Sequence, residues 1–125
     1  MARPRIRLLI GDAVALGPGK ARLLEAIGTT GSIAAAARTM GMSYGRAWQL
    51  VQAMNGDFRA ALVERAAGGR GGGGAALTAL GLEALDRYRS MEARADAAVA
   101  DDLDEFAALL RTPEPGDPVD ESPTV

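Results

Sequence analysis

Two capped helical segments, separated by about three residues, constrain the fold of this chain more than any other feature of its sequence. Ser32 is a good N-cap for a short helix over residues 33–40, which Gly41 would end. Ser43 then caps a second helix over residues 44–58. Two capped helices joined by a tight turn predict a helix-turn-helix, and an ordinary helical hairpin inside a bundle is the alternative.

A run of six glycines around Arg70 follows the second helix. Glycine is entropically unfavourable to order, so the run is either a linker or a place where the backbone approaches another molecule closely. Strand-like segments at residues 61–65 and 75–78 flank the run and predict a β-hairpin. A hairpin directly after a helix-turn-helix is the wing of a winged helix. Its glycine-rich tip can lie against a phosphate backbone, and Arg70 supplies positive charge there.

The remaining segments complete a mainly α-helical protein with a small β-hairpin. We expect a strand at 5–10, a connection at 11–17, a helix at 18–28, the elements above, an alanine-rich helix at 80–100 and a further turn or two at 103–110. The predicted fold is a winged helix-turn-helix with a long C-terminal dimerisation helix. The predicted division is a DNA-binding domain at 1–79, a dimerisation helix region at 80–110 and a disordered acidic tail at 111–125.

The apolar side of the C-terminal helix extends beyond a small core and therefore needs a partner. Tyr88, Val99 and Leu110 are eleven residues apart, which is close to three helical turns. A second copy of the chain is the simplest partner. We expect the homodimer interface to contain Leu85, Tyr88, Val99 and Leu103.

Charge is divided unequally along the chain, although the net charge is only −2. Residues 1–94 hold 13 Lys and Arg against 7 Asp and Glu, whereas residues 95–125 hold 1 Arg against 9 Asp and Glu. A basic body with an acidic tail is typical of proteins that meet polyanions, and simple solvation of the tail is the alternative.

Missing residue types argue against an enzyme. The chain has no Cys and no His, which removes thiolate chemistry, the commonest general base and the commonest neutral metal ligand. The only lysine, Lys20, is followed by Ala21 and does not fit a nucleotide-binding phosphate loop. We therefore assign no catalytic residues, no metal ligands and no cofactor. Apolar runs near the N-terminus are short and broken, so we expect neither a signal peptide nor a membrane span, and we expect a cytoplasmic protein.

Exposed positions near the start of the second helix carry side chains that suit DNA recognition. Arginine suits guanine O6 and N7, and glutamine suits adenine N6 and N7. Backbone N–H groups at the start of this helix can hold a phosphate. A solvated helix face is the alternative, and Trp48 is expected in the core, with a base contact as its alternative. The predicted DNA-binding residues are Ser32, Ser43, Tyr44, Gly45, Arg46, Gln49, Gln52 and Arg70.

Several motifs together resemble one family of regulators. These are TGSI at residues 30–33, GMSY at 41–44, the wing segment LVERAAGGRGGGGAALT at 62–78, and Gly81. They look like the N-terminal domain of the molybdate-dependent transcriptional regulators, the ModE family, and more distantly like the DNA-binding half of LysR-type regulators. The match covers roughly residues 18–95. The resemblance implies a winged helix-turn-helix that dimerises through the helix after the wing and binds a palindromic operator in molybdate-transport genes.

The chain also departs from that family. Full-length members carry oxyanion-binding domains after the dimerisation helix, whereas nothing in this sequence resembles such a domain, so we expect no direct binding of molybdate. Gly45 and Arg46 stand where a basic and then a small residue are expected, which points to a different target sequence.

We therefore predict a homodimeric, sequence-specific transcriptional regulator that binds double-stranded DNA. A dimeric winged helix that binds a protein instead of DNA is the alternative, and a steep salt dependence of duplex affinity would distinguish the two.

Overall fold

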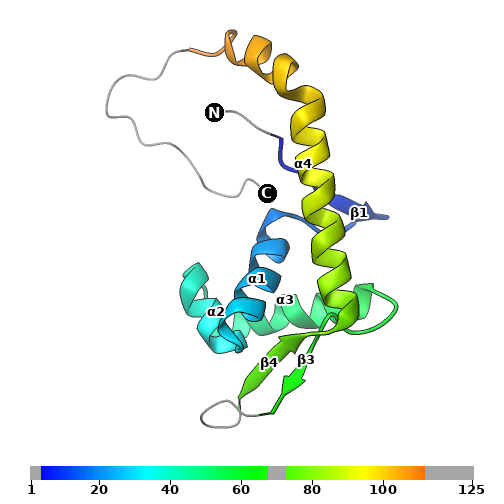
Figure 1. Ribbon diagram of the computed structural model, residues 1–125. Coiled ribbons are helices and arrows are strands. Elements are labelled where there is room, and N and C mark those ends of the chain that lie inside the picture. Colours follow the sequence, from blue (N-terminus) through cyan, green and yellow to red (C-terminus); the bar gives the residue numbers. More distant parts are fainter. Residues whose placement is uncertain (1–3, 68–72, 112–125) are drawn as a thin grey trace.

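The computed structural model describes residues 4–67 and 73–111, where a compact body carries one long projecting helix (Figure 1). Its elements, in chain order, are β1 (Leu8–Ile10), β2 (Ala13–Leu16), α1 (Pro18–Thr30), α2 (Ile33–Met40), α3 (Tyr44–Asp57), β3 (Val63–Ala66), β4 (Gly74–Leu77) and α4 (Ala79–Ala107). The mainly helical winged helix-turn-helix with a long C-terminal helix is therefore confirmed.

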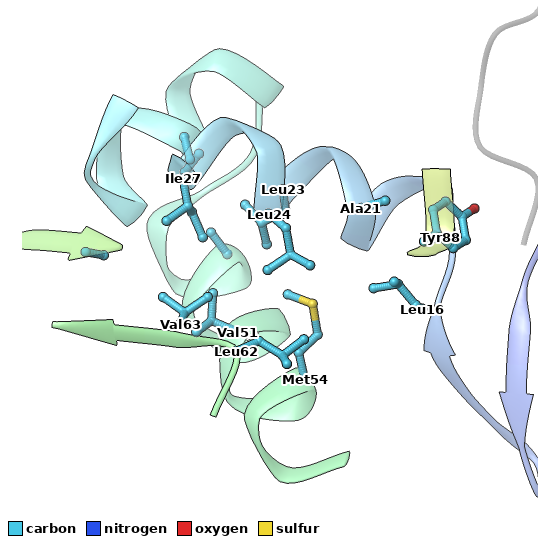
Figure 2. Packing of buried hydrophobic residues seen from close by; sticks show 14 residues of the cluster. Leu16, Ala21, Leu23, Leu24, Ile27, Val51, Met54, Leu62, Val63 and Tyr88 are labelled. Carbon is cyan, nitrogen blue, oxygen red and sulfur yellow. The ribbon is translucent and has the colours of Figure 1, made fainter. Parts of the chain in front are cut away.

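Helices α1, α2 and α3 meet around one apolar core (Figure 2). α1 and α3 each present apolar side chains three or four residues apart, the spacing that places them on one helix face. α2 contributes alanines, whose small side chains allow its neighbours to approach closely. The buried members from these helices are Ala21, Leu23, Leu24, Ile27, Ala36, Ala37, Ala47, Val51 and Met54.

The turn between α2 and α3 depends on Gly41. This residue has a φ of 68°, a left-handed conformation that favours glycine. It allows the N–H of Met42 to donate to the carbonyl of Ala37 at 3.0 Å, which closes the end of α2. The chain then enters α3 at once, so the two capped helices form the predicted helix-turn-helix.

The wing is the antiparallel hairpin β3–β4, in which Val63 pairs with Leu77 and Ala66 with Gly74. Its strands lie closer to the glycine run than the sequence predicts. Gly74 is required there, because a Cβ at this position would lie 2.6 Å from the carbonyl oxygen of Ala66. Asn55 of α3 fixes the base of the wing: its side-chain oxygen accepts from the N–H groups of Leu62 and Val63, and its amide donates to the carbonyl of Val63.

A second hairpin near the N-terminus corrects the prediction of a connection at residues 11–17. β1 pairs with β2 in antiparallel fashion across a two-residue turn, Gly11–Asp12. Gly11 has a φ of 61°, the left-handed conformation that such turns need. A Gly-Asp pair after an apolar run was the available signal. Leu16 of β2 then enters the core beside α1.

Helix α4 is continuous from Ala79 to Ala107, so the expected helix at 80–100 and most of the further turns at 103–110 form one element. Thr78 caps it by accepting from the N–H of Gly81 at 3.0 Å. Gly81 packs so closely under the wing that a Cβ there would lie 2.2 Å from the carbonyl oxygen of Leu62. Beyond the body, no other helix or strand of the described residues packs against this helix (Figure 1). Within the described ranges, none of the helices combines the length and the apolar character needed to cross a membrane.

Candidate nucleic-acid interface

The first turn of α3 has its cap and open donors at the protein surface. The hydroxyl oxygen of Ser43 accepts from the N–H of Arg46 at 3.1 Å, as expected for an N-cap. Ser43, Tyr44 and Gly45 are all exposed. The first N–H groups of a helix have no partner within it, so this end of α3 can donate to an anion.

The exposed face of α3 consists mostly of small and polar residues. Ala47, Val51 and Met54 point into the core, so the opposite side of the helix carries Gly45, Gln49 and other exposed residues. A Cβ at Gly45 would meet nothing within 4 Å. A helix face without bulk at its centre can lie deep in the major groove, and glutamine side chains there can reach base edges.

Trp48 is exposed, which corrects its expected place in the core. Its exposed fraction is 47%, and that of Tyr44, one turn earlier on the same helix, is 55%. The core-facing positions of α3 are filled by other residues, so the helix turns both aromatic side chains toward the wing. The exposure of Trp48 depends on how α3 docks on α1 and α2, which its own sequence does not reveal.

A groove of about 360 Å³ separates α3 from the wing. Tyr44, Trp48 and Gln52 line one wall, at intervals of one helical turn. Glu64 and Arg65 of β3 stand on the other. The predicted wing contact, Arg70, lies outside the described residues. The neighbouring Arg65 is a candidate that sequence reasoning missed, although its place in the strand before the glycine run was a usable signal.

Positive charge is concentrated around this groove and the helix-turn-helix. Residues 31–67 contain four arginines, all of them exposed, and only two acidic residues, Asp57 and Glu64. The four are Arg38, Arg46, Arg59 and Arg65. Ser32 is half-buried, and its hydroxyl accepts from the N–H of Ala35 at 2.8 Å, which caps α2 near the same surface. Among the described residues, no group of three or more Asp and Glu is placed to hold a metal ion.

The residues predicted for the dimer interface have different environments. Leu85 is half-buried against the core, whereas Val99 and Leu103 lie half-exposed on the projecting part of α4. Tyr88 has an exposed fraction of 0%, so it belongs to the core of one chain, which corrects its assignment to a surface between two chains. Three large apolar side chains that were not assigned are exposed near the end of the helix: Phe106, Leu109 and Leu110.

Tyr88 and Arg89 fix α4 to the body. The Tyr88 hydroxyl donates to the carbonyl of Ile6 at 2.6 Å, and burial raises the pKa of this phenol. Arg89 Nε donates to the carboxylate of Glu25 on α1 at 2.7 Å, and its Nη1 donates to Glu92 at 2.6 Å. The hydrogen bond to Glu25 raises the pKa of the Arg89 guanidinium. The first two contacts join α4 to the N-terminal segment and to α1.

Comparison with known proteins agrees with this geometry. The sequence profile of the bacterial regulatory helix-turn-helix proteins of the LysR family matches residues 19–82. The molybdenum-pterin-binding protein MopB of Rhodobacter capsulatus is 50% identical over 78 residues, which cover 62% of this chain and 29% of MopB. The DNA-binding transcriptional dual regulator ModE of Escherichia coli K12 is 44% identical over 71 residues, which cover 57% of this chain and 27% of ModE.

The fold is also similar to that of a solved protein–DNA complex. The DNA-binding domain of CbnR, crystallised with DNA, superposes with a TM-score of 0.54 at 27% sequence identity, over 72% of this chain and 95% of that domain. The matched segments span less than a third of the length of MopB and ModE. The similarity therefore concerns only a part of each of these relatives, and in this chain the family profile covers the helix-turn-helix and its wing.

Proposed function

This chain belongs to the LysR family of bacterial regulatory helix-turn-helix proteins, and we propose that it regulates transcription by binding a specific sequence in double-stranded DNA. The observation that carries the proposal is the exposed face of α3, which lies beside the wing and has the exposed Arg46 on the same helix and Arg65 across the groove. ModE of Escherichia coli is named as a DNA-binding regulator, and the CbnR domain was solved on DNA, which supports the same role here.

In the proposed complex α3 enters the major groove with its N-terminal half. Gln49 and Gln52 contact base edges from the exposed face, and Arg46 reaches a guanine or a phosphate from the margin of that face.

Ser43 and Tyr44 at the start of α3 contact the DNA backbone, where Gly45 permits close approach. Ser32 at the start of α2 contacts the adjacent phosphate, because the first N–H groups of both helices open toward the same surface.

The wing makes contacts that carry little base information. Arg70 stands in the glycine run, and Arg65 precedes it on β3. A guanidinium that meets the phosphate backbone or the minor groove raises affinity for any duplex and fixes the register of the protein on it. We assign this positioning role to both arginines.

The protein acts as a homodimer on a palindromic operator. The apolar residues on the projecting part of α4 have no partner within the described chain, and a second copy would cover them by a two-fold interface. A two-fold dimer presents two copies of α3 to half-sites about 34 Å apart, or a multiple of that distance. The interface consists of Val99, Leu103, Phe106 and Leu110, with Leu85 at its inner margin.

The genes under control concern molybdenum. Relatives at 40–50% identity carry molybdenum transport or molybdenum-pterin binding in their names. Direct binding of molybdate by these residues is not part of the proposal. The candidate anion donors at the starts of α2 and α3 lie on the surface assigned to DNA, so an oxyanion there would compete with phosphate.

The decisive experiment selects bound sequences from a random duplex library and measures their affinity at several salt concentrations. Gln49→Ala should relax the base preference at one position of each half-site. Arg70→Ala should weaken binding to all sequences alike. It should also lower the steepness with which the logarithm of affinity falls with the logarithm of salt concentration, by about one unit per half-site. Arg94→Ala, which removes the same charge from the projecting part of α4, is the matched control and should change neither quantity. Failure to enrich any sequence, with affinity independent of salt, would favour the protein-interaction module instead.

A further inference from the structure

The two aromatic side chains on α3 have no structural role that accounts for their exposure. Trp48 and Tyr44 are about half exposed, although both are large enough to contribute strongly to a core. The core-facing side of α3 is completed by Ala47, Val51 and Met54. The aromatic pair therefore faces the groove beside the wing and leaves apolar surface available to a ligand.

This apolar surface is continuous with a polar group that suits adenine. Tyr44, Trp48 and Gln52 follow each other at one-turn intervals on the same wall of the groove. Glutamine can pair with N6 and N7 of adenine in the major groove. The only apolar group that a base pair presents in the major groove is the C5-methyl of thymine, which belongs to the partner of that adenine.

We propose that Trp48 and Tyr44 recognise thymine methyl groups, and that with Gln52 they give the protein a preference for A·T pairs on the wing side of α3. This inference rests on the proposed DNA binding and adds specificity-determining residues to it. The indole of Trp48, which extends from the middle of the helix, makes the main contact. Tyr44 lies one turn closer to the phosphate backbone and covers the outer side of the same methyl group.

Removing the methyl groups from DNA tests the contact without disturbing the protein. The sequence selected by the wild-type protein is prepared with thymine and, in parallel, with uracil, which lacks only the C5-methyl. We expect uracil to weaken wild-type binding about fourfold for each methyl contacted, from about 0.8 kcal/mol per buried methyl-sized group. Trp48→Ala should bind thymine DNA more weakly than the wild-type protein does, and its affinity should fall little further when uracil replaces thymine. Gln49→Ala, weakened at a different base, should keep the wild-type ratio of thymine to uracil affinity.

Trp48 also provides a direct signal, because it is the only tryptophan in the chain. Its emission should shift to shorter wavelength when operator DNA covers the half-exposed indole. Circular dichroism of Trp48→Ala, recorded in parallel, shows whether the variant has kept its helices. An exposed side chain makes few stabilising contacts, so we expect the spectrum to be unchanged.

The outcomes separate this inference from the proposed function. If no duplex is enriched, DNA binding itself is wrong. If a sequence is enriched but wild-type affinity is equal for thymine and uracil, or if Trp48→Ala retains the full uracil loss, the methyl contact is wrong while DNA binding stands. An unchanged Trp48 emission at saturating operator overturns the contact as well.

Discussion

Helices α3 and α4 both bury one face in the same core, yet their exposed surfaces differ in chemistry. α3 exposes glycine, glutamine and two aromatic residues and carries one Arg and one Asp. α4 carries three Arg against eight Asp and Glu, and its free end exposes Phe106. An acidic helix repels a phosphate backbone, so its apolar side chains suit protein contact instead. We therefore propose that exposed apolar surface contacts DNA on α3 and a second chain on α4.

The apolar face of α4 also changes role along its length. At 100° per residue, Tyr88, Val99 and Phe106 point to nearly the same side of the helix. At Tyr88 that side is buried in the core of the same chain, whereas at Phe106 the side chain is 59% exposed. One continuous stripe thus belongs to the core at its start and to a surface at its end.

The largest effect that tests this comparison is expected at Gly81. Gly81→Ala should lower the free energy of unfolding by about 3 kcal/mol, because the new Cβ would collide with the carbonyl oxygen of Leu62. Gly45→Ala is the matched change on α3, where the position is open, and should stabilise the helix by up to about 1 kcal/mol. Urea unfolding followed by circular dichroism measures both. Equal effects at the two glycines would contradict the close packing of α4 under the wing.

A smaller loss in the free energy of unfolding is expected at Asn55, which joins α3 to the base of the wing. Asn55→Ala removes three hydrogen bonds to the backbone of Leu62 and Val63 and leaves their N–H groups unpaired. We expect a loss of about 2 kcal/mol in the free energy of unfolding. Gln52→Ala, on the exposed side of the same helix, should remain within about 0.5 kcal/mol of wild type. Comparable unfolding midpoints for the two variants would show that Asn55 does not tie α3 to the wing.

Tyr88→Phe tests the covered part of the α4 stripe. Loss of the hydrogen bond to Ile6 should lower stability by about 1 kcal/mol near neutral pH. Burial raises the pKa of Tyr88, so folding disfavours the phenolate. The wild-type protein should therefore lose stability as the pH rises above about 10, where the unfolded chain begins to ionise at this residue. Thermal unfolding from pH 8 to 11 measures this slope, which should be shallower in Tyr88→Phe. If stability fell equally steeply with pH in the wild-type protein and in Tyr88→Phe, Tyr88 would be open to solvent.

The free part of the stripe should show the smallest effect on folding. Phe106→Glu is expected to change the free energy of unfolding of a monomer by less than about 0.5 kcal/mol, because its side chain is 59% exposed. The same variant should shift the protein from dimer to monomer in sedimentation at micromolar concentration. Ala97→Glu introduces the same charge on the opposite side of α4 and should leave the dimer intact. A wild-type monomer, or equal behaviour of the two variants, would remove the proposed interface.

Local sequence patterns determined the helix-turn-helix. Ser32 and Ser43 each cap a helix through a hydrogen bond to a residue three positions later, and Gly41 supplies the left-handed turn between them. The glycine run likewise predicted a hairpin in the correct place. These features depend on neighbours in the chain, so a single sequence contains all of their determinants.

Only the tertiary structure decided which apolar residues are covered. Trp48 and Tyr88 look equally suited to a core, yet one lies beside a groove and the other is fully buried. Tyr88 is buried among core residues such as Leu16 and Ala21, more than 60 positions away, and its hydroxyl donates to the carbonyl of Ile6, 82 positions away. Arg89 of α4 likewise pairs with Glu25 of α1, 64 positions away. Burial depends on partners that are distant in sequence, so periodicity shows which face of a helix is apolar but not what covers it.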